Sequence, residues 1–313
     1  MSPGKRVCAC GEIAIWNTLD KQPPRIIAHR GASGYLPEHS TAGYRLAMEQ
    51  GADVIEPDLV VSRDGVLYVH HDLGLSKTTD VAAHAEFADR AHDGDWWVND
   101  FDAAELDRLR LVQRWPQRDH GHDGRYVMPR FVDMLDQVMA FGDAAGRVLW
   151  VYPEIKHPTY FRQRGHDPLA LLLPILEARH ATGPDARVWL QCLDHAVLHE
   201  ARERCGNPCY ALIEEIDPSN LETMLEELSA WAQGIAPDKN LLWDARGHDS
   251  GLVRMAHDMG LEVHAWTFRD DVDAPPFAHP GDALRMALSL GVDALFCDFP
   301  DTALAVRHTM AAC

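Results

Sequence analysis

The feature that most constrains the fold is a repeated alternation of short β-branched runs with longer segments of helical periodicity. This alternation is typical of strand-helix units in a parallel sheet, because each parallel strand needs a crossover connection to the next. Eight strand candidates follow one another, at residues 25–28, 54–59, 148–155, 188–192, 210–213, 234–236, 261–267 and 294–298. Helical patterns cover residues 41–50, 131–141, 169–179, 195–204, 221–231, 252–259, 282–290 and 302–310.

Eight such units in 313 residues predict an α/β fold, a closed (β/α)8 TIM-type barrel. We expect one barrel domain over residues 25–313, preceded by an N-terminal extension over residues 1–24. The stretch at about residues 72–129 is too long for an ordinary strand-to-helix loop. We interpret it as a small insertion after the second strand that covers the C-terminal face of the barrel and contains a helix over residues 102–111.

The charge balance restricts the partners. A formal net charge of -19 repels polyanions and argues against nucleic acid as a partner, so an anionic substrate has to be attracted locally. The first twenty residues lack an apolar run followed by a small-residue cleavage site, and no window holds eighteen apolar residues without charge. We therefore expect a cytoplasmic protein without stable membrane insertion, with a processed periplasmic form as the alternative. Seven cysteines, an odd number, favour free thiols over disulfides or a zinc site.

Acidic residues lie at the ends of neighbouring expected strands. Glu56 and Asp58 are two residues apart on the second strand, so both side chains point to the same side, and Glu154 ends the third. Each of them alone could be an ion-paired surface acid. Three carboxylates at one barrel mouth would repel one another unless a cation neutralises them. Hard oxygen ligands predict one divalent ion, Ca²⁺ or Mg²⁺.

Two histidines lie near these acids in the expected barrel. His29 closes the first strand, and His71 ends a short run after the turn-type dipeptide Asp64-Gly65. Strand alternation places His71 on one face and His70 on the opposite face. A single histidine is more often structural than catalytic, but a pair beside a metal site favours catalysis.

Several of these segments together carry a family likeness from about residue 25 to residue 310. The chain resembles the bacterial glycerophosphodiester phosphodiesterases, in the branch with the full Tyr-Leu-Pro-Glu-His form of the first motif. The matching segments are residues 29–40 (HRGASGYLPEHS), 55–59 (IEPDL), 71–72 (HD), 153–156 (PEIK), 234–238 (GIAPD), 263–267 (VHAWT) and 291–301 (GVDALFCDFPD). Pro57, between the two carboxylates, departs from the family pattern and lacks an amide donor that could shape the metal site.

The resemblance implies a role for each group. It implies that His29 and His71 act as general base and acid, that Arg30 contacts the phosphoryl oxygens, and that the three carboxylates hold the metal. From the residues themselves, Glu38 and Asp72 are expected to orient the ligands or histidines. Lys156 would contact the phosphate or neutralise Glu154, and Trp266 would pack on the glycerol or line the core.

The expected reaction is hydrolysis of a small glycerophosphodiester to glycerol 3-phosphate and an alcohol. In this hypothesis the 2-hydroxyl of the glycerol attacks phosphorus, and water then opens the cyclic phosphate. Two imidazoles with ordinary pKa values of about 6.5 can divide into one neutral and one protonated member, and we favour His29 as the first base. The alternatives are a lysophospholipase D or phospholipase-type enzyme on the same barrel, and a catalytically inactive binding barrel. The head-group alcohol and the oligomeric state stay open.

Overall fold

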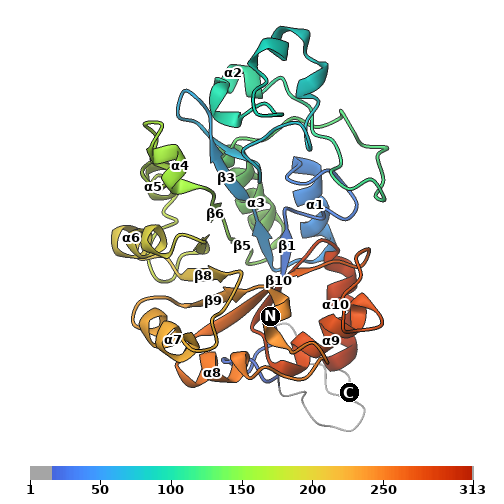
Figure 1. Cartoon of the computed structure of the whole chain (residues 1–313), viewed down its shortest axis with the longest axis vertical. Helices are drawn as coiled ribbons and strands as arrows, with labels where there is room; N and C mark the ends of the chain where they lie inside the picture. Colours follow the sequence, from blue (N-terminus) through green and yellow to red (C-terminus); the bar gives the residue numbers. More distant parts are fainter. Residues whose placement is uncertain (1–15, 312–313) are drawn as a thin grey trace.

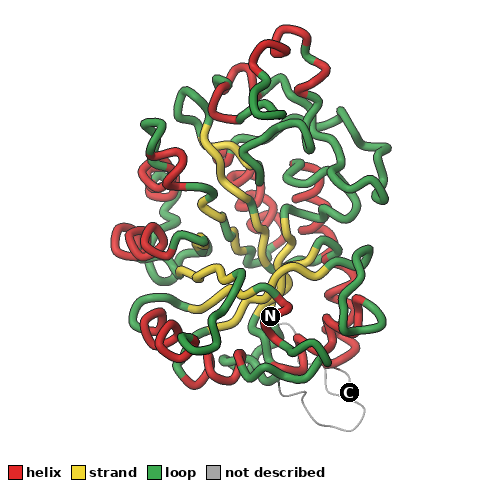
Figure 2. Tube along the Cα trace, in the orientation of Figure 1, coloured by secondary structure: helices red, strands yellow, loops and turns green. Residues whose placement is uncertain are grey.

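The structure is a computed structural model that describes residues 16–311. Its centre is an eleven-stranded sheet, curled so that the strands enclose a common core (Figures 1 and 2). In the order of pairing, the strands are β4 (Leu67–Val69), β3 (Asp58–Val61), β6 (Glu154–Ile155), β7 (Leu190–Cys192), β8 (Cys209–Ile213), β9 (Gly234–Pro237), β10 (Glu262–Phe268), β11 (Ala294–Cys297), β1 (Arg25–His29), β2 (Val54–Glu56) and β5 (Trp150–Val151).

Two of the expected barrel strands are interrupted. Pro57 separates β2 from β3, and Tyr152 and Pro153 separate β5 from β6. The two halves keep the same neighbour, because β2 pairs in parallel with β5 and β3 pairs in parallel with β6. Counting each interrupted strand once gives eight barrel strands, and the pairing of β1 with both β11 and β2 completes the ring. The predicted eight-stranded barrel is confirmed.

β4 is the additional strand. It pairs antiparallel with β3 and extends the second barrel strand as a hairpin toward the insertion. The hairpin turns at Gly65, whose φ of 81° is the left-handed conformation that glycine adopts without strain. This hairpin delivers the residues that follow β4 to the C-terminal end of the barrel.

Helices surround the barrel, and one short helix lies apart from them in the insertion (Figure 1). They are α1 (Thr41–Gln50), α2 (Ala103–Leu106), α3 (Phe131–Ala145), α4 (Pro158–Arg162), α5 (Pro168–Glu177), α6 (His195–Cys205), α7 (Leu221–Ser229), α8 (Leu252–Asp258), α9 (Pro280–Leu290) and α10 (Pro300–Ala311). Short 3-10 turns are η1 (Val81–Ala83), η2 (Ala85–Arg90), η3 (Val98–Asp100) and η4 (Lys239–Leu242). Within residues 16–311, no helix combines the length and the apolar character that crossing a bilayer requires.

The insertion differs from the prediction in its secondary structure. The expected helix over residues 102–111 is wrong, because only α2 is helical there. Asp102 and Glu105 form a capping box that begins the helix, but the chain becomes extended soon afterwards. Arg110 pairs with Val127 and Leu111 with Thr79, so backbone pairing with other segments of the insertion replaces a continued helix.

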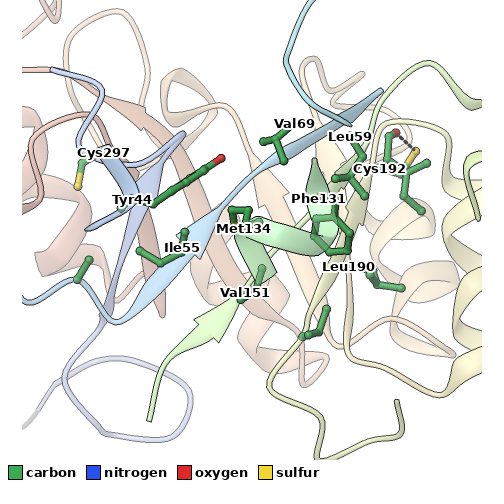
Figure 3. Packing of buried hydrophobic residues seen from close by; sticks show 14 of the residues in the cluster. Tyr44, Ile55, Leu59, Val69, Phe131, Met134, Val151, Leu190, Cys192 and Cys297 are labelled. Atoms are coloured by element: carbon green, nitrogen blue, oxygen red, sulfur yellow. Dashed lines mark hydrogen bonds between the residues drawn. The ribbon is translucent and has the colours of Figure 1, made fainter. Parts of the chain in front are cut away.

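The core has two parts. The larger part fills the space between the strands and the helices, and Figure 3 shows Tyr44 of α1 and Phe131 and Met134 of α3 among side chains of the sheet. The smaller part lies inside the barrel, where Tyr152, Trp189 and Tyr210 form aromatic contacts with centroids 5.2–5.5 Å apart. This aromatic layer fills the barrel interior, as is usual for the fold.

The N-terminal end of the described chain packs on the barrel. Arg307 of α10 donates to the Pro24 carbonyl at 2.9 Å and to Asp53 at 2.7 Å, and the Leu19 amide donates to Asp293 at 2.6 Å. Residues 1–15 of the expected extension lie outside the described residues. So do Cys8, Cys10 and Cys313, whereas the cysteines at 192, 205, 209 and 297 are free thiols.

Candidate active site

Three carboxylates meet at the C-terminal end of the barrel. Glu56 ends β2, Asp58 begins β3 and Glu154 begins β6, in register with Asp58. One oxygen from each of the three lies within 4.8 Å of the others. The backbone amide of Arg30 donates to Glu56 at 3.0 Å, and Lys156 Nζ donates to Glu154 at 2.8 Å. The interruption at Pro57 therefore does not separate the two acids of the second strand.

The charges of this carboxylate cluster are incompletely compensated by the protein. Burial and then the charge of Asp58 raise the pKa of Glu56 well above its usual value. Burial raises the pKa of Glu154 to about 7, although Lys156 opposes the shift. Burial alone would also raise the pKa of Asp58, but His71, Arg30 and Lys156 together hold it well below the usual value. A set of hard oxygen donors with excess negative charge fits a divalent cation such as Mg²⁺ or Ca²⁺.

His29 lies at the end of β1 and is held by an acid of the last strand. Its Nδ1 is 2.7 Å from Oδ1 of Asp298, the residue that follows β11. Burial and the charge of Arg30 lower the pKa of His29 to about 3, despite the opposing effect of Asp298. The imidazole is therefore neutral at physiological pH, as a proton acceptor has to be.

His71 lines the same cavity as His29. Its Nδ1 contacts Oδ1 of Asp72, and its Nε2 is 3.3 Å from Lys156 Nζ. Burial, followed by the charge of Arg30, lowers the pKa of His71 to about 4. From the sequence we expect the two imidazoles to divide into one neutral and one protonated member. In the protein without substrate both pKa values are low, because both rings are buried beside cationic side chains.

His70, the neighbour of His71 in the sequence, does not belong to the site. His70 points away from the cavity, as strand alternation predicts, and its ring bonds to the Asp72 carbonyl and the Thr78 hydroxyl, each at 2.7 Å. His70 is 1% exposed and both of its ring nitrogens have partners. It is a structural histidine.

Arg30 joins the first motif to the carboxylate cluster. Its Nη1 donates to Glu38 at 3.1 Å, and its Nε is 3.2 Å from Asp58. Burial lowers the pKa of the guanidinium, but the charges of Glu38 and Asp58 outweigh this effect and raise it. The left-handed φ values of Arg30 (60°) and Gly31 (84°) turn the backbone sharply after β1. This turn directs the guanidinium toward the acids.

One cavity contains most of the predicted site residues. Its walls combine cationic, acidic and apolar side chains, with Trp266 on the side of β10 and β9. Trp266 donates its indole N–H to the Ala236 carbonyl at 2.7 Å and also packs against the aromatic layer of the barrel. The lining residues are His29, Arg30, Glu56, His71, Glu154, Lys156, Gln191, Leu193, Leu212, Glu214, Trp266, Thr267, Arg269 and Phe296.

Asp72 contacts His71, one of the two histidines, whereas Glu38 accepts from Arg30, which is neither a histidine nor one of the expected metal ligands. The structure also adds residues that the sequence analysis did not assign to the site. Asp298 could have been found, because it ends an expected strand where barrel active sites are built. Gln191, which donates to Glu56 at 3.1 Å, occupies a similar position on β7. Two further residues, Arg114 and Arg118, come from irregular parts of the insertion and left no recognisable sequence signal.

Comparisons with known proteins identify the family of the chain. A family model described as the glycerophosphoryl diester phosphodiesterase family matches residues 29–302. A glycerophosphodiester phosphodiesterase of Arabidopsis thaliana is 29% identical over 90% of this chain and 85% of its own length. A glycerophosphodiester phosphodiesterase of Haemophilus influenzae is 28% identical over 94% of this chain and 93% of its own.

A solved structure gives the same fold. A phosphodiesterase of Oleispira antarctica, in complex with its product sn-glycerol-3-phosphate, superposes with a TM-score of 0.68. The match covers 93% of this chain and 99% of that chain, at 21% identity. Because the family model spans most of the barrel and includes every acid and histidine of the cavity, this chain belongs to the glycerophosphoryl diester phosphodiesterase family of enzymes.

Proposed function

We propose that this enzyme hydrolyses glycerophosphodiesters to glycerol 3-phosphate and an alcohol, with one divalent cation held by Glu56, Asp58 and Glu154. The observation that carries the proposal is the cluster of these carboxylates at a cavity that is also lined by two carboxylate-bound histidines. The relatives named for this activity support the substrate class.

Binding of the phosphodiester depends on the cationic side chains of the cavity. Arg30, Lys156 and Arg269 all line it, and they provide the local positive charge that a chain with a net charge of -19 otherwise lacks. When bound, the divalent cation would polarise the phosphoryl group and offset the negative charge that grows in the transition state.

Proton transfer is assigned to the two histidines. His29, neutral because its pKa is lowered by burial, accepts the proton of the glycerol 2-hydroxyl as this oxygen attacks phosphorus. His71 donates a proton to the oxygen of the leaving alcohol. The negative charge of the bound phosphodiester favours the protonated form of His71, which counteracts the effect of burial. Water then opens the cyclic phosphate with the two roles reversed.

The test is a product assay with defined metal content. Purified protein is incubated with glycerophosphocholine after treatment with chelator and after addition of Ca²⁺ or Mg²⁺. We expect release of glycerol 3-phosphate only with added cation, and none from Glu56→Gln. The exposed surface variant Glu226→Gln is the matched control and keeps full activity. Turnover that is unaffected by chelator would exclude the metal-dependent reaction.

A second substrate set tests the internal attack and the competing enzyme class. An analogue without the 2-hydroxyl cannot undergo the attack of that oxygen on phosphorus and is expected to remain uncleaved. Equal turnover of this analogue would contradict the role of the 2-hydroxyl. Faster turnover of lysophospholipids than of glycerophosphocholine would replace the proposed substrate class by that of a lysophospholipase D.

A further inference from the structure

Two arginines of the insertion reach the partner acids of the two histidines. Arg114 and Arg118 lie four residues apart in an irregular segment, and their side chains are 17% and 3% exposed. Long cationic side chains are seldom buried to this extent unless they are paired. Their contacts therefore indicate what this segment of the insertion is for.

Arg118 holds the acid that binds His29. Its Nη2 donates to Oδ2 of Asp298 at 2.7 Å, and Oδ1 of the same carboxylate is 2.7 Å from His29 Nδ1. Arg118 donates three further hydrogen bonds, to Asp271 at 2.7 Å and 3.0 Å and to the Ser33 carbonyl at 3.0 Å. Asp271 and the Ser33 carbonyl thus hold the guanidinium of Arg118 in place, and this guanidinium holds the carboxylate of Asp298. Arg269 shares Oδ2 of Asp298 at 3.0 Å.

Arg114 repeats this arrangement on the other histidine. Its Nη2 donates to Oδ2 of Asp72 and to Oε1 of Glu38, each at 2.9 Å. The remaining oxygen of Asp72, Oδ1, contacts His71 Nδ1. Glu38 in turn accepts from Arg30. One guanidinium therefore links the partner of His71 to the partner of Arg30.

The two arrangements share one chemical consequence. In each, an aspartate gives one oxygen to an imidazole Nδ1 and the other to an arginine, so the carboxylate cannot rotate away from the ring. An ionised carboxylate at Nδ1 keeps the proton on that nitrogen and leaves Nε2 for the reaction. Arginine suits this task better than lysine, because its planar fork can bind two acceptors in a fixed geometry.

We propose that Arg114 and Arg118 are positioning residues, by which the insertion sets the orientation of both histidines through Asp72 and Asp298. This inference rests on the proposed function, because it assigns no new reaction. It gives the insertion a part in turnover: the barrel supplies the histidines and their acids, and the insertion holds these acids in place.

The first test measures kcat and KM for glycerophosphocholine in single variants of the metal-loaded, full-length protein. We expect Arg118→Met to lower kcat by about tenfold or more with a smaller change in KM, in the range typical for groups that orient a functional side chain. Arg118→Lys, which keeps the charge, should recover part of this loss.

The decisive comparison uses the histidine variants as backgrounds. If Arg118 acts through His29, Arg118→Met should change kcat by less than about twofold in His29→Ala, but should have its full effect in His71→Ala. Arg114→Met should show the opposite preference, losing its effect in His71→Ala. A purely structural arginine would reduce kcat by the same factor in both backgrounds, which would overturn the proposal.

Arg90 provides the matched control within the insertion. It forms an ion pair with Glu105 at 2.6 Å and lies over the rings of Phe87 and Phe101, and none of these residues lines the active-site cavity. Arg90→Met should leave kcat unchanged. An equal loss in Arg90→Met would mean that the insertion acts only by being folded, and would also overturn the proposal. An inactive wild-type protein would refute the proposed function instead, so the two failures are distinguishable.

Discussion

Replacing one of the acids proposed to bind the metal should stabilise the protein when no metal is present. In the metal-free protein, burial raises the pKa of Glu154 from 4.5 to about 7. The folded state therefore binds this proton more tightly than the unfolded chain does, so stability falls as the pH rises from 4.5 to 7. A shift of this size corresponds to about 3 kcal/mol of unfolding free energy. Glu154→Gln removes the charge and keeps an oxygen that can accept from Lys156.

The assay is urea unfolding in the presence of chelator at several pH values. At pH 8 we expect Glu154→Gln to be more stable than the wild type by up to about 3 kcal/mol, and at pH 4 the two should be equal. With Mg²⁺ or Ca²⁺ in thousandfold excess over Kd the order should reverse, because only the wild type gains binding energy, about 4.1 kcal/mol, which exceeds its deficit. A variant that is less stable than the wild type at pH 8 in chelator would refute the reasoning.

Three further predictions follow from the fold and the site. His29→Ala and His71→Ala should each lower kcat by about 100-fold or more with unchanged circular dichroism, and near-normal turnover in either would remove that histidine from the mechanism. Gly31→Ala should destabilise the protein in thermal unfolding by more than Gly146→Ala, because its Cβ would lie 2.8 Å from the backbone of α1 whereas Gly146 faces open space; equal losses would contradict this packing. Burial alone would raise the pKa of Glu262, but its contacts with His264 and Tyr210 outweigh burial and lower this pKa to about 2. Glu262→Gln should therefore lower the free energy of unfolding by about 3 kcal/mol at pH 7 and by about half of that near pH 3. A loss that does not depend on pH would contradict this assignment.

The sequence predicted the barrel and the acids of its mouth because both depend on local periodicity. Glu56 and Asp58 reach the same cluster as alternation requires, even though Pro57 divides their strand. The position of His70, facing away, follows from the same alternation. The direction of side chains near a strand end can therefore be predicted from the sequence wherever consecutive residues stay close to extended geometry.

The parts that escaped prediction depend on contacts between distant segments. The helix expected over residues 102–111 ends early because Arg110 and Leu111 pair with other parts of the insertion. The roles of Arg114 and Arg118 depend on the path of this irregular chain across the barrel mouth, which no periodic pattern encodes. The low pKa values of His29 and His71 likewise arise from burial, which single positions in a sequence do not report.

The hydrogen bond between Arg307 of α10 and the Pro24 carbonyl has a practical consequence. Arg307 holds α10 to Pro24, just before β1 begins, so both ends leave the barrel beside the starts of its strands. The substrate opening is at the other rim, where the strands finish. An affinity tag joined directly to either end of residues 16–311 would start on the side away from the mouth of the barrel, and such a truncated, immobilised protein should turn over substrate as freely as the same protein in solution.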